Sequence, residues 1–552
     1  MKRRNFLKNI LPLAAVPLVS NKLFASVLPA SAISPEALTI LAEDTERVLV
    51  LVRLHGGNDG LNTLIPLDQY GKLIDPKLRK DIMLPQNSIL KISDTLGFHA
   101  SMPEMQTLFK EQRLTIIQGV ANTARNFSHF HGTDQWESAS DQNNTYNSGW
   151  IGRYIEQVYP QAPQGYPNTL MPDPFAMEIG AAPSLLVRGS TGTLAQSVPV
   201  GFTGQLTQLV DNFNSTDISK NMQAELAFLR VQQGYTNQYG EKIIKAWNLG
   251  MNSSVAYPAS VVPSVNNFNQ GLTTLSQQLK IVARLLKGGI KTRVFVVNIG
   301  NFDTHANQGT VIGTGLHSLL LKDLSAAIGA FQKDLDNLGL SDRVIGMTYS
   351  EFGRRVASNN VKSTEHGFGA PMFVFGNKVS GTVIGSNYQV PDISALNQVQ
   401  ISGLVVDMQY DYRQVYMSVL RDWFSLCKND AVNVLKKDVQ PVSAFKPGTA
   451  MVNCLTDVHE IESRGNYLSA TVQPNPSNGS LKIVLQDGFD FSIPVQFTLS
   501  DMQGRTLLRM SKQTNKGTAI DLQLNLSPGL YILTMQNGTR LLNKKLIITN
   551  GD

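Results

Sequence analysis

Residues 47–62 read Arg-Val-Leu-Val-Leu-Val-Arg-Leu-His-Gly-Gly-Asn-Asp-Gly-Leu-Asn, an apolar run that passes directly into a glycine-rich polar turn. Such a run of Val and Leu, without polar alternation, is typical of a strand buried on both faces, as in a parallel sheet. Similar runs recur at 114–120, 293–299, 343–349 and 371–375, and segments with helical spacing include 272–287 and 316–338. Strands that alternate with helices predict an α/β fold, in which a mostly parallel sheet carries helices on both faces.

Polar motifs follow several of the predicted strands. They are His-Gly-Gly-Asn-Asp-Gly at 55–60, Asn-Phe-Asp-Thr-His at 301–305, Ser-Glu-Phe-Gly-Arg-Arg at 350–355 and Thr-Glu-His-Gly at 364–367. Because the carboxyl ends of parallel strands line one crevice, we expect these motifs to meet there. Carboxylate and imidazole groups together suit zinc, manganese or iron. The sequence therefore predicts a divalent-metal site built from Asp59, Asp303, His305, Glu351 and His366.

The predicted ligands divide into two sets. Asp303, His305 and His366 are expected to hold one ion, and Asp59 and Glu351 are expected to hold a second ion together with a nucleophile. For Asp59 the alternative is a helix cap, because an Asp after a glycine turn often has that role. Glu365 is expected beside the ligands rather than among them.

Ser128 is the predicted nucleophile. It follows the apolar run at 114–120 and precedes His129 and His131, and a metal or a base would be needed to activate its hydroxyl. The alternative is that Ser128 only caps a helix and that both histidines serve packing or the surface; Thr133 is the second candidate. Arg153 and Arg354 are expected to bind an anionic group in bidentate fashion, although either arginine could instead pair with a structural carboxylate.

The N-terminus has the features of an export signal over residues 1–30. A basic head, Lys-Arg-Arg-Asn-Phe-Leu-Lys at 2–8, precedes a mild apolar run and small residues. The paired arginines predict the twin-arginine type, and an ordinary secretory signal is the alternative. No apolar run reaches the roughly 20 residues of a spanning helix, so we expect no transmembrane segment.

Composition excludes some classes of protein. The chain has 552 residues with a formal net charge of +6, and no Lys/Arg block interleaved with aromatic residues occurs, so no nucleic-acid partner is expected. Its two cysteines, Cys427 and Cys454, either pair in an oxidising compartment or stay free.

The chain is expected to contain two domains. We expect a body over 45–430 with a polar insertion at about 161–267, a linker over 431–465, and a separate β-domain over 466–552. In the β-domain, turn motifs such as Asp-Gly and Asn-Gly separate short strands in the manner of an immunoglobulin-like sandwich.

The C-terminal segment resembles the type A sorting domain of the type IX secretion system of Bacteroidota. The matching stretches are Val-Gln-Pro-Asn-Pro-Ser-Asn-Gly at 472–479, Leu-Ser-Asp-Met-Gln-Gly-Arg at 499–505, Leu-Ser-Pro-Gly-Leu-Tyr-Ile at 526–532 and Lys-Lys-Leu-Ile-Ile at 544–548. The resemblance implies recognition by the type IX secretion machinery and passage through the periplasm to the cell surface or the medium.

The body resembles the domain of unknown function 1501 family, a distant relative of the alkaline phosphatase and sulfatase superfamily. The resemblance is carried by the motifs above, by Ser-His-Phe at 128–130 and by Ser-Gly-Trp-Ile-Gly-Arg-Tyr at 148–154. It implies an alkaline-phosphatase-like fold, one or two divalent ions (zinc, manganese, iron or calcium), and hydrolysis of a phosphate or sulfate ester in a small molecule or a polymer. Phe352 stands where the superfamily has a histidine ligand, so a second ion would need His55, His129 or His131 instead. The alternative is a surface binding protein that keeps the fold without turnover.

Overall fold

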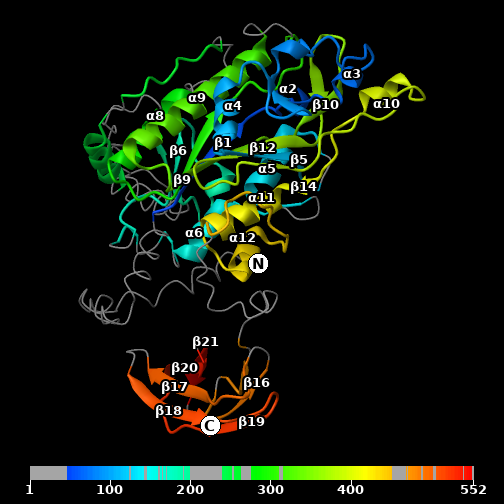
Figure 1. Cartoon of the computed structure of the whole chain (residues 1–552). Coiled ribbons are helices and arrows are strands. Elements are labelled where there is room, and N and C mark those ends of the chain that lie inside the picture. Colours follow the sequence, from blue (N-terminus) through cyan, green and yellow to red (C-terminus); the bar gives the residue numbers. More distant parts are fainter. Residues whose placement is uncertain are drawn as a thin grey trace, which may run out of the picture. The chain divides into compact units, whose positions relative to one another are not determined.

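The structure is a computed structural model of the whole chain (Figure 1). It describes residues 46–449, 468 and 470–549, apart from 124–125, 142–145, 160–161, 164–165, 169–170, 191, 199–238, 252–253, 263–274, 310–314, 476, 487–488, 502–504 and 539. A compact body ends at Asn453, and a second unit begins at Cys454.

A nine-stranded sheet forms the centre of the body. Its order is β13 (Val383–Ile384), β5 (Leu114–Ala121), β12 (Ala370–Phe375), β9 (Val344–Tyr349), β1 (Val48–Leu54), β8 (Val294–Ile299), β6 (Ala176–Ile179) and β7 (Ala195–Val198), with β14 (Tyr410–Asp411) also paired to β5. β1 is parallel to β8 and β9, whereas β12 is antiparallel to β5 and β9. The chain reaches β12 from β9 through a hairpin, and an antiparallel strand needs no crossover helix. The predicted mostly parallel sheet is confirmed.

Alternate residues of β1 enter two different cores. Val48, Val50 and Val52 pack with α4 (Pro103–Lys110), α8 (Leu275–Lys287) and α9 (Leu316–Leu338). Leu49 and Leu51 pack with the helices of the other face, which are α5 (His129–Ser138), α6 (Trp150–Val158), α11 (Tyr412–Ser418), η5 (Val419–Trp423) and α12 (Lys428–Leu435). Figure 1 shows α4, α8 and α9 on one side of the sheet and α6, α11 and α12 on the other. Helices on both faces, as predicted, explain why β1 is apolar from Val48 to Val52.

Short elements extend the carboxyl end of the sheet. They are α2 (Gly60–Thr63), β2 (Leu64–Pro66), α3 (Tyr70–Leu73), η3 (Gln86–Ser88), β3 (Leu90–Lys91), β4 (Leu96–Phe98), η4 (Leu185–Val187), α10 (Gln398–Ser402), and the antiparallel hairpin of β10 (Arg354–Ser358) and β11 (Thr364–His366). The hairpin supplies one of the histidines of the site described below.

Two of the predicted segments differ from the structure. The insertion expected at 161–267 contains β6 and β7, which extend the central sheet; residues 199–238 and 263–267 of it lie outside the described residues. The linker expected from residue 431 begins inside α12, and Leu435 and Phe445 are buried in the body. These elements are short, four residues each in β6 and β7 and eight in α12, so their apolar residues form no run long enough to reveal the burial.

The C-terminal unit is all β, as predicted. One sheet has the order β15 (Ala470–Gln473), β16 (Ser480–Leu485) and β19 (Ala519–Gln523), and the other has β18 (Thr506–Lys512), β17 (Val495–Asp501), β20 (Gly529–Asn537) and β21 (Arg540–Ile548). All of these neighbouring strands pair antiparallel. Ile483 and Phe497, one from each sheet, lie in a single apolar core.

Cys427 is disulfide-bonded, and no described cysteine is free. The chain's other cysteine, Cys454, lies outside the described residues. Among the helices that the structure describes, none is long and apolar enough to cross a membrane.

Candidate metal centre

Three histidines and one aspartate meet beyond the carboxyl ends of the central strands. His129 begins α5, Asp303 and His305 follow β8, and His366 ends β11. The Nε2 atom of His366 lies 3.1 Å from Nε2 of His129 and 2.8 Å from Nε2 of His305. Asp303 completes the group: its Oδ1 is 2.8 Å from Nε2 of His305 and 3.2 Å from Nε2 of His366, and its Oδ2 is 3.3 Å from Nε2 of His129. We call these four residues the imidazole cluster.

Each imidazole of the cluster is held from behind through its other nitrogen. Nδ1 of His129 lies 2.7 Å from Oε1 of Glu351, and Nδ1 of His305 lies 3.1 Å from Oε2 of Glu365. Nδ1 of His366 donates to the Phe127 carbonyl at 2.7 Å, because a carbonyl oxygen only accepts. A carboxylate or carbonyl that fixes one ring nitrogen is the usual arrangement behind a metal-binding histidine, because it directs the other nitrogen toward the ion.

Glu351 therefore lies behind His129 and not among the converging atoms. Its side chain is buried, and Oε1 also accepts a hydrogen bond from the Gly56 amide at 2.8 Å. Glu351 was predicted to be a ligand, but in the structure its side chain orients His129. The sequence analysis had named His129 only as a possible substitute ligand.

The charges of the cluster stabilise one another. The hydrogen bonds of His129 with Asp303 and Glu351 raise the pKa of His129 to about 9, although partial burial opposes this shift. Burial also opposes ionisation of Asp303, but its bonds with His129, His366 and Arg354 hold the pKa of this carboxyl well below its usual range. Asp303 is therefore a carboxylate at neutral pH, as a metal ligand must be.

Phe352 lies against the imidazole cluster. Its ring centroid is 4.9 Å from that of His129 and 4.8 Å from that of His366. His55 stacks on the far side of His129, with a centroid separation of 6.4 Å. Phe352 thus packs against two histidines of the cluster, and its ring offers no ligand atom to a metal.

Asp59 belongs to a different, closed group. Its Oδ2 accepts hydrogen bonds from Nη2 of Arg79 and from Nε2 of Gln308, both at 2.5 Å, and its side chain is buried. Burial opposes ionisation, but Arg79 and the nearby His317 lower the pKa of Asp59. The predicted ligand Asp59 is therefore engaged in an ion pair apart from the imidazole cluster, and metal binding by Asp59 stays a prediction. Asp59 stands at the N-cap position of α2 without making a side-chain cap, so the structure does not show the alternative role.

The two arginines predicted to bind an anion both make hydrogen bonds to groups of the protein itself. Arg153 donates to the carbonyls of Val434, Ser148 and Ser138, which ties α6 to its neighbours. Arg354 is buried and donates to the Gly57 and Thr364 carbonyls and, at 2.6 Å, to Oδ1 of Asp303. Neither guanidinium is available to clamp an ester, which corrects the prediction; Arg354 instead positions Asp303.

Ser128 lies beside the cluster at the N-cap position of α5. Its side chain is exposed and makes no capping bond, and its amide donates to Oδ1 of Asn126 at 2.9 Å. The residues on either side, Phe127 and His129, both contact the imidazole cluster. Thr133 lies one turn further along the same helix, away from its N-terminus.

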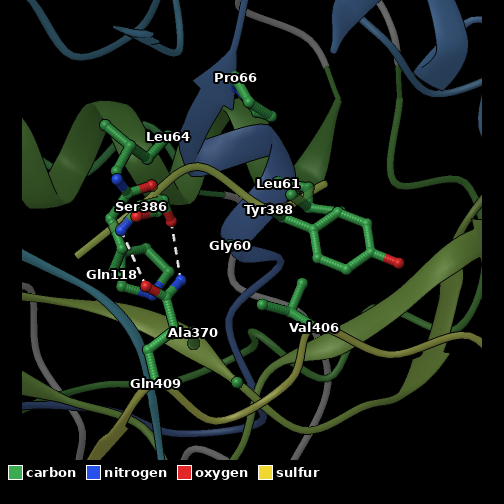
Figure 2. A pocket seen from close by; sticks show the side chains of 13 residues that line it. Gly60, Leu61, Leu64, Pro66, Gln118, Ala370, Ser386, Tyr388, Val406 and Gln409 are labelled. Atoms are coloured by element: carbon green, nitrogen blue, oxygen red, sulfur yellow. Dashed lines mark hydrogen bonds between the residues drawn. The ribbon is translucent and has the colours of Figure 1, made fainter. Parts of the chain in front are cut away.

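Figure 2 shows a separate pocket between β5, β12 and the start of α2. Gln409 closes one side of it through two bonds with Ser386, donating from Nε2 to the carbonyl at 2.7 Å and accepting from the amide at 2.8 Å. The pocket is lined largely by Leu, Pro, Val, Gly and Ala, and none of its lining residues is charged or belongs to the imidazole cluster. We assign the chemistry of the body to the cluster and not to this pocket.

The fold and the site define an α/β protein with a candidate metal centre at the carboxyl end of its sheet. A family described as "Protein of unknown function (DUF1501)" matches residues 46–437, and the chain belongs to this family. A secretion system C-terminal sorting domain matches residues 471–549. This domain implies export by the type IX machinery to the cell surface or beyond.

No curated protein matches the chain, and the solved structures that match it do so at low sequence identity. One is a protein in the alkaline phosphatase superfamily from Vibrio parahaemolyticus, with 7% identity, 91% of this chain and 83% of that chain covered, and a TM-score of 0.32. Another is a phosphonate monoester hydrolase from Silicibacter pomeroyi, with 7% identity, coverage of 62% and 70%, and a TM-score of 0.28. The alkaline phosphatase of the Antarctic bacterium TAB5 has 8% identity, coverage of 71% and 99%, and a TM-score of 0.28.

Proposed function

We propose that this protein is an exported metal-dependent hydrolase of phosphate or sulfate esters whose ion is held by His129, Asp303, His305 and His366. The proposal rests on the geometry of the imidazole cluster and not on the similar structures. Its ligand set keeps three of the residues predicted from the sequence, Asp303, His305 and His366, and replaces Asp59 and Glu351 by His129.

One observation carries the proposal. Nδ1 of His366 must hold a proton to donate to the Phe127 carbonyl, so a ring with this one proton presents a bare lone pair at Nε2. Nε2 of His305 faces this lone pair at 2.8 Å, while its own Nδ1 faces Glu365. Two imidazole nitrogens in this relation repel each other unless a proton or a cation lies between them.

The donor set fits a divalent transition metal. His129, Asp303 and His366 offer ligand atoms that all lie within 4.8 Å of one another, and His305 adjoins two of them. Three histidine nitrogens and a carboxylate suit zinc, and histidines with one carboxylate also suit iron or manganese. When bound, such an ion lowers the pKa of a hydroxyl or water and polarises an ester oxygen.

The surrounding side chains would keep the ligands in place during the reaction. Glu351 and Glu365 hold His129 and His305, and Arg354 holds Asp303. We assign the nucleophile to Ser128, because its exposed side chain lies between two residues that contact the cluster. The N-terminus of α5 adds a positive helix-dipole end at this point, which favours a negatively charged ester.

A non-catalytic surface binding protein is the second candidate function. The observation in its favour is that Asp59 is closed in an ion pair and Phe352 replaces a ligand, so the residues of a second ion are not assembled. Two-metal esterases use the second ion to stabilise the leaving oxygen. A single-ion site keeps the means to bind an anionic group but supplies less assistance to its cleavage.

We also propose how the protein is exported. The sorting domain accounts for the last step of export, and we assign the first step to a twin-arginine signal at residues 1–30, which lie outside the described part of the chain. A folded passenger of this route can acquire its metal before it reaches the periplasm.

The test compares wild-type protein with Ser128→Ala, each loaded with zinc, manganese, iron or calcium. We expect the wild type to hydrolyse aryl phosphates or aryl sulfates and the variant to lose at least about 100-fold in turnover, because covalent catalysis needs the hydroxyl. Metal content by mass spectrometry should be equal in both. No turnover by any metal-loaded wild-type sample would favour the binding protein, and full activity in Ser128→Ala would move the search to Thr133.

A further inference from the structure

The imidazole cluster is open to solvent. About 44% of the Asp303 side chain and 41% of the His305 side chain are exposed, although both contribute atoms to the cluster. An open metal site encloses little of a substrate, so affinity and selectivity must come from groups around its edge.

An exposed aromatic residue, Phe130, lies in the first turn of α5 together with His129. Phe130 directly follows His129, so their Cα atoms are about 3.8 Å apart. Its side chain is 87% exposed, the largest value for any large hydrophobic residue in the described part of the chain, where it is also the one aromatic residue among the exposed large hydrophobics. Single exposed apolar residues are common on protein surfaces, so it is the place of Phe130 directly after a cluster histidine, and not its exposure alone, that makes it a candidate contact for a ligand.

A second ring and a cation continue the edge. The Phe127 carbonyl accepts from His366, and the Arg355 guanidinium lies over the Phe127 ring at 6.0 Å from its centroid. Arg355 also donates from Nε to the His366 carbonyl at 3.2 Å and from Nη1 to the Ser402 carbonyl at 2.8 Å. We call Phe127, Phe130 and Arg355 the aromatic rim.

We propose that the aromatic rim selects esters whose leaving group carries a ring, either an aryl group or a sugar, and that Phe130 is the residue that contacts this ring. Aromatic side chains stack on flat rings and on the apolar faces of sugars, and an exposed ring needs no rearrangement to do so. Arg355 places a positive charge at the same edge, which favours a ring with further anionic substituents. The inference rests on the proposed function and adds a substrate class to it.

The experiment measures binding rather than turnover. The probes are phenylphosphonate and methylphosphonate, which share the anionic head and differ in the ring, and the protein is the zinc-loaded full chain in a calorimeter. We expect phenylphosphonate to bind about threefold to tenfold more tightly, the range that corresponds to one aromatic contact. Phe130→Ala should remove this ratio without changing the Kd of methylphosphonate or the zinc content, and Phe130→Tyr should keep it.

The matched control is Val399→Ala, because Val399 is 82% exposed on α10 and belongs to neither the cluster nor the rim. It should leave both Kd values unchanged. Equal binding of the two phosphonates by the wild type, or an unchanged ratio in Phe130→Ala, would overturn the rim and leave the metal site intact. Failure of both phosphonates to bind zinc-loaded protein would overturn the proposed anion-binding metal site, and the rim with it.

Discussion

Two polar clusters lie beyond the same strands of the body and contain the same residue types, yet their environments are opposite. In the imidazole cluster, Asp303 is exposed and faces three histidine nitrogens. In the closed cluster, Asp59 is buried against Arg79 and Gln308, and His317 is buried nearby. The difference shows that two carboxylates that each follow a strand can have opposite solvent access, and only the accessible one is free to receive an ion from solution.

The histidines of the two clusters differ in the same way. Burial lowers the pKa of His317 to about 4, so this ring is neutral throughout the physiological range. The bonds of His129 with Asp303 and Glu351 raise its pKa to about 9. The pKa values of these two histidines thus differ by about five, because His317 is desolvated and His129 is paired with carboxylates.

The largest expected effect is on stability and concerns the closed cluster. Asp59→Ala should lower the free energy of unfolding by about 3–5 kcal/mol, because it leaves the buried Arg79 without its partner. Denaturant titration measures the loss. The control Asp59→Ala with Arg79→Met removes both charges and should recover most of the stability. A stable Asp59→Ala protein that no longer holds metal would instead restore Asp59 to the ligands.

The next effect is on metal affinity and concerns the open cluster. His366→Ala should weaken zinc binding at least about 100-fold, since removal of groups behind a ligand already costs 10–100-fold. Competition with a chelator measures the affinity. Stability without metal should fall by only about 1 kcal/mol, the cost of one lost hydrogen bond.

His317→Gln is the matched control for His366→Ala. It should show the reverse pattern, with reduced stability and unchanged zinc affinity per folded molecule, because His317 belongs to the closed cluster. If both histidine variants lose zinc equally, the division of the two clusters is wrong.

The smallest effect is the pH dependence of metal binding. A metal must displace the proton from His129, so apparent zinc affinity should rise about tenfold per pH unit from about pH 7 and level off near pH 9. Glu351→Gln removes one of the groups that raise this pKa, so its affinity should level off at a lower pH. Affinity that does not change between pH 7 and 8.5 would show that His129 is not a ligand.

Much of the architecture could be predicted from local patterns. Apolar runs such as 47–54 and helical spacing such as 316–338 correspond to β1 and α9, because burial on two faces or one leaves a direct mark on the sequence. The C-terminal turn motifs likewise predicted an all-β unit. β6 and β7 have only four residues each, too few to show a strand pattern, and these strands were missed for that reason.

Only part of the site could be predicted from the sequence. Asp303, His305 and His366 were predicted on their motifs and do lie together, and Phe352 was correctly noted as unable to bind a metal. His129 was offered only as a substitute, since nothing local distinguishes it from His131. His129, and not His131, lies in the imidazole cluster because of the direction of α5 and because Glu351, which is distant along the chain, holds the His129 ring.

The sequence alone therefore determined the residue types, the strands that bring them to one edge of the sheet, and the C-terminal sorting domain, because each of these depends on neighbours along the chain. Only the tertiary structure decided which polar residues are open and which are closed. Asp59 and Asp303 follow similar strands, but Arg79 reaches one of them inside the protein, whereas Arg354 reaches the other and leaves it exposed. That choice depends on long-range packing and solvent access, which no local pattern encodes.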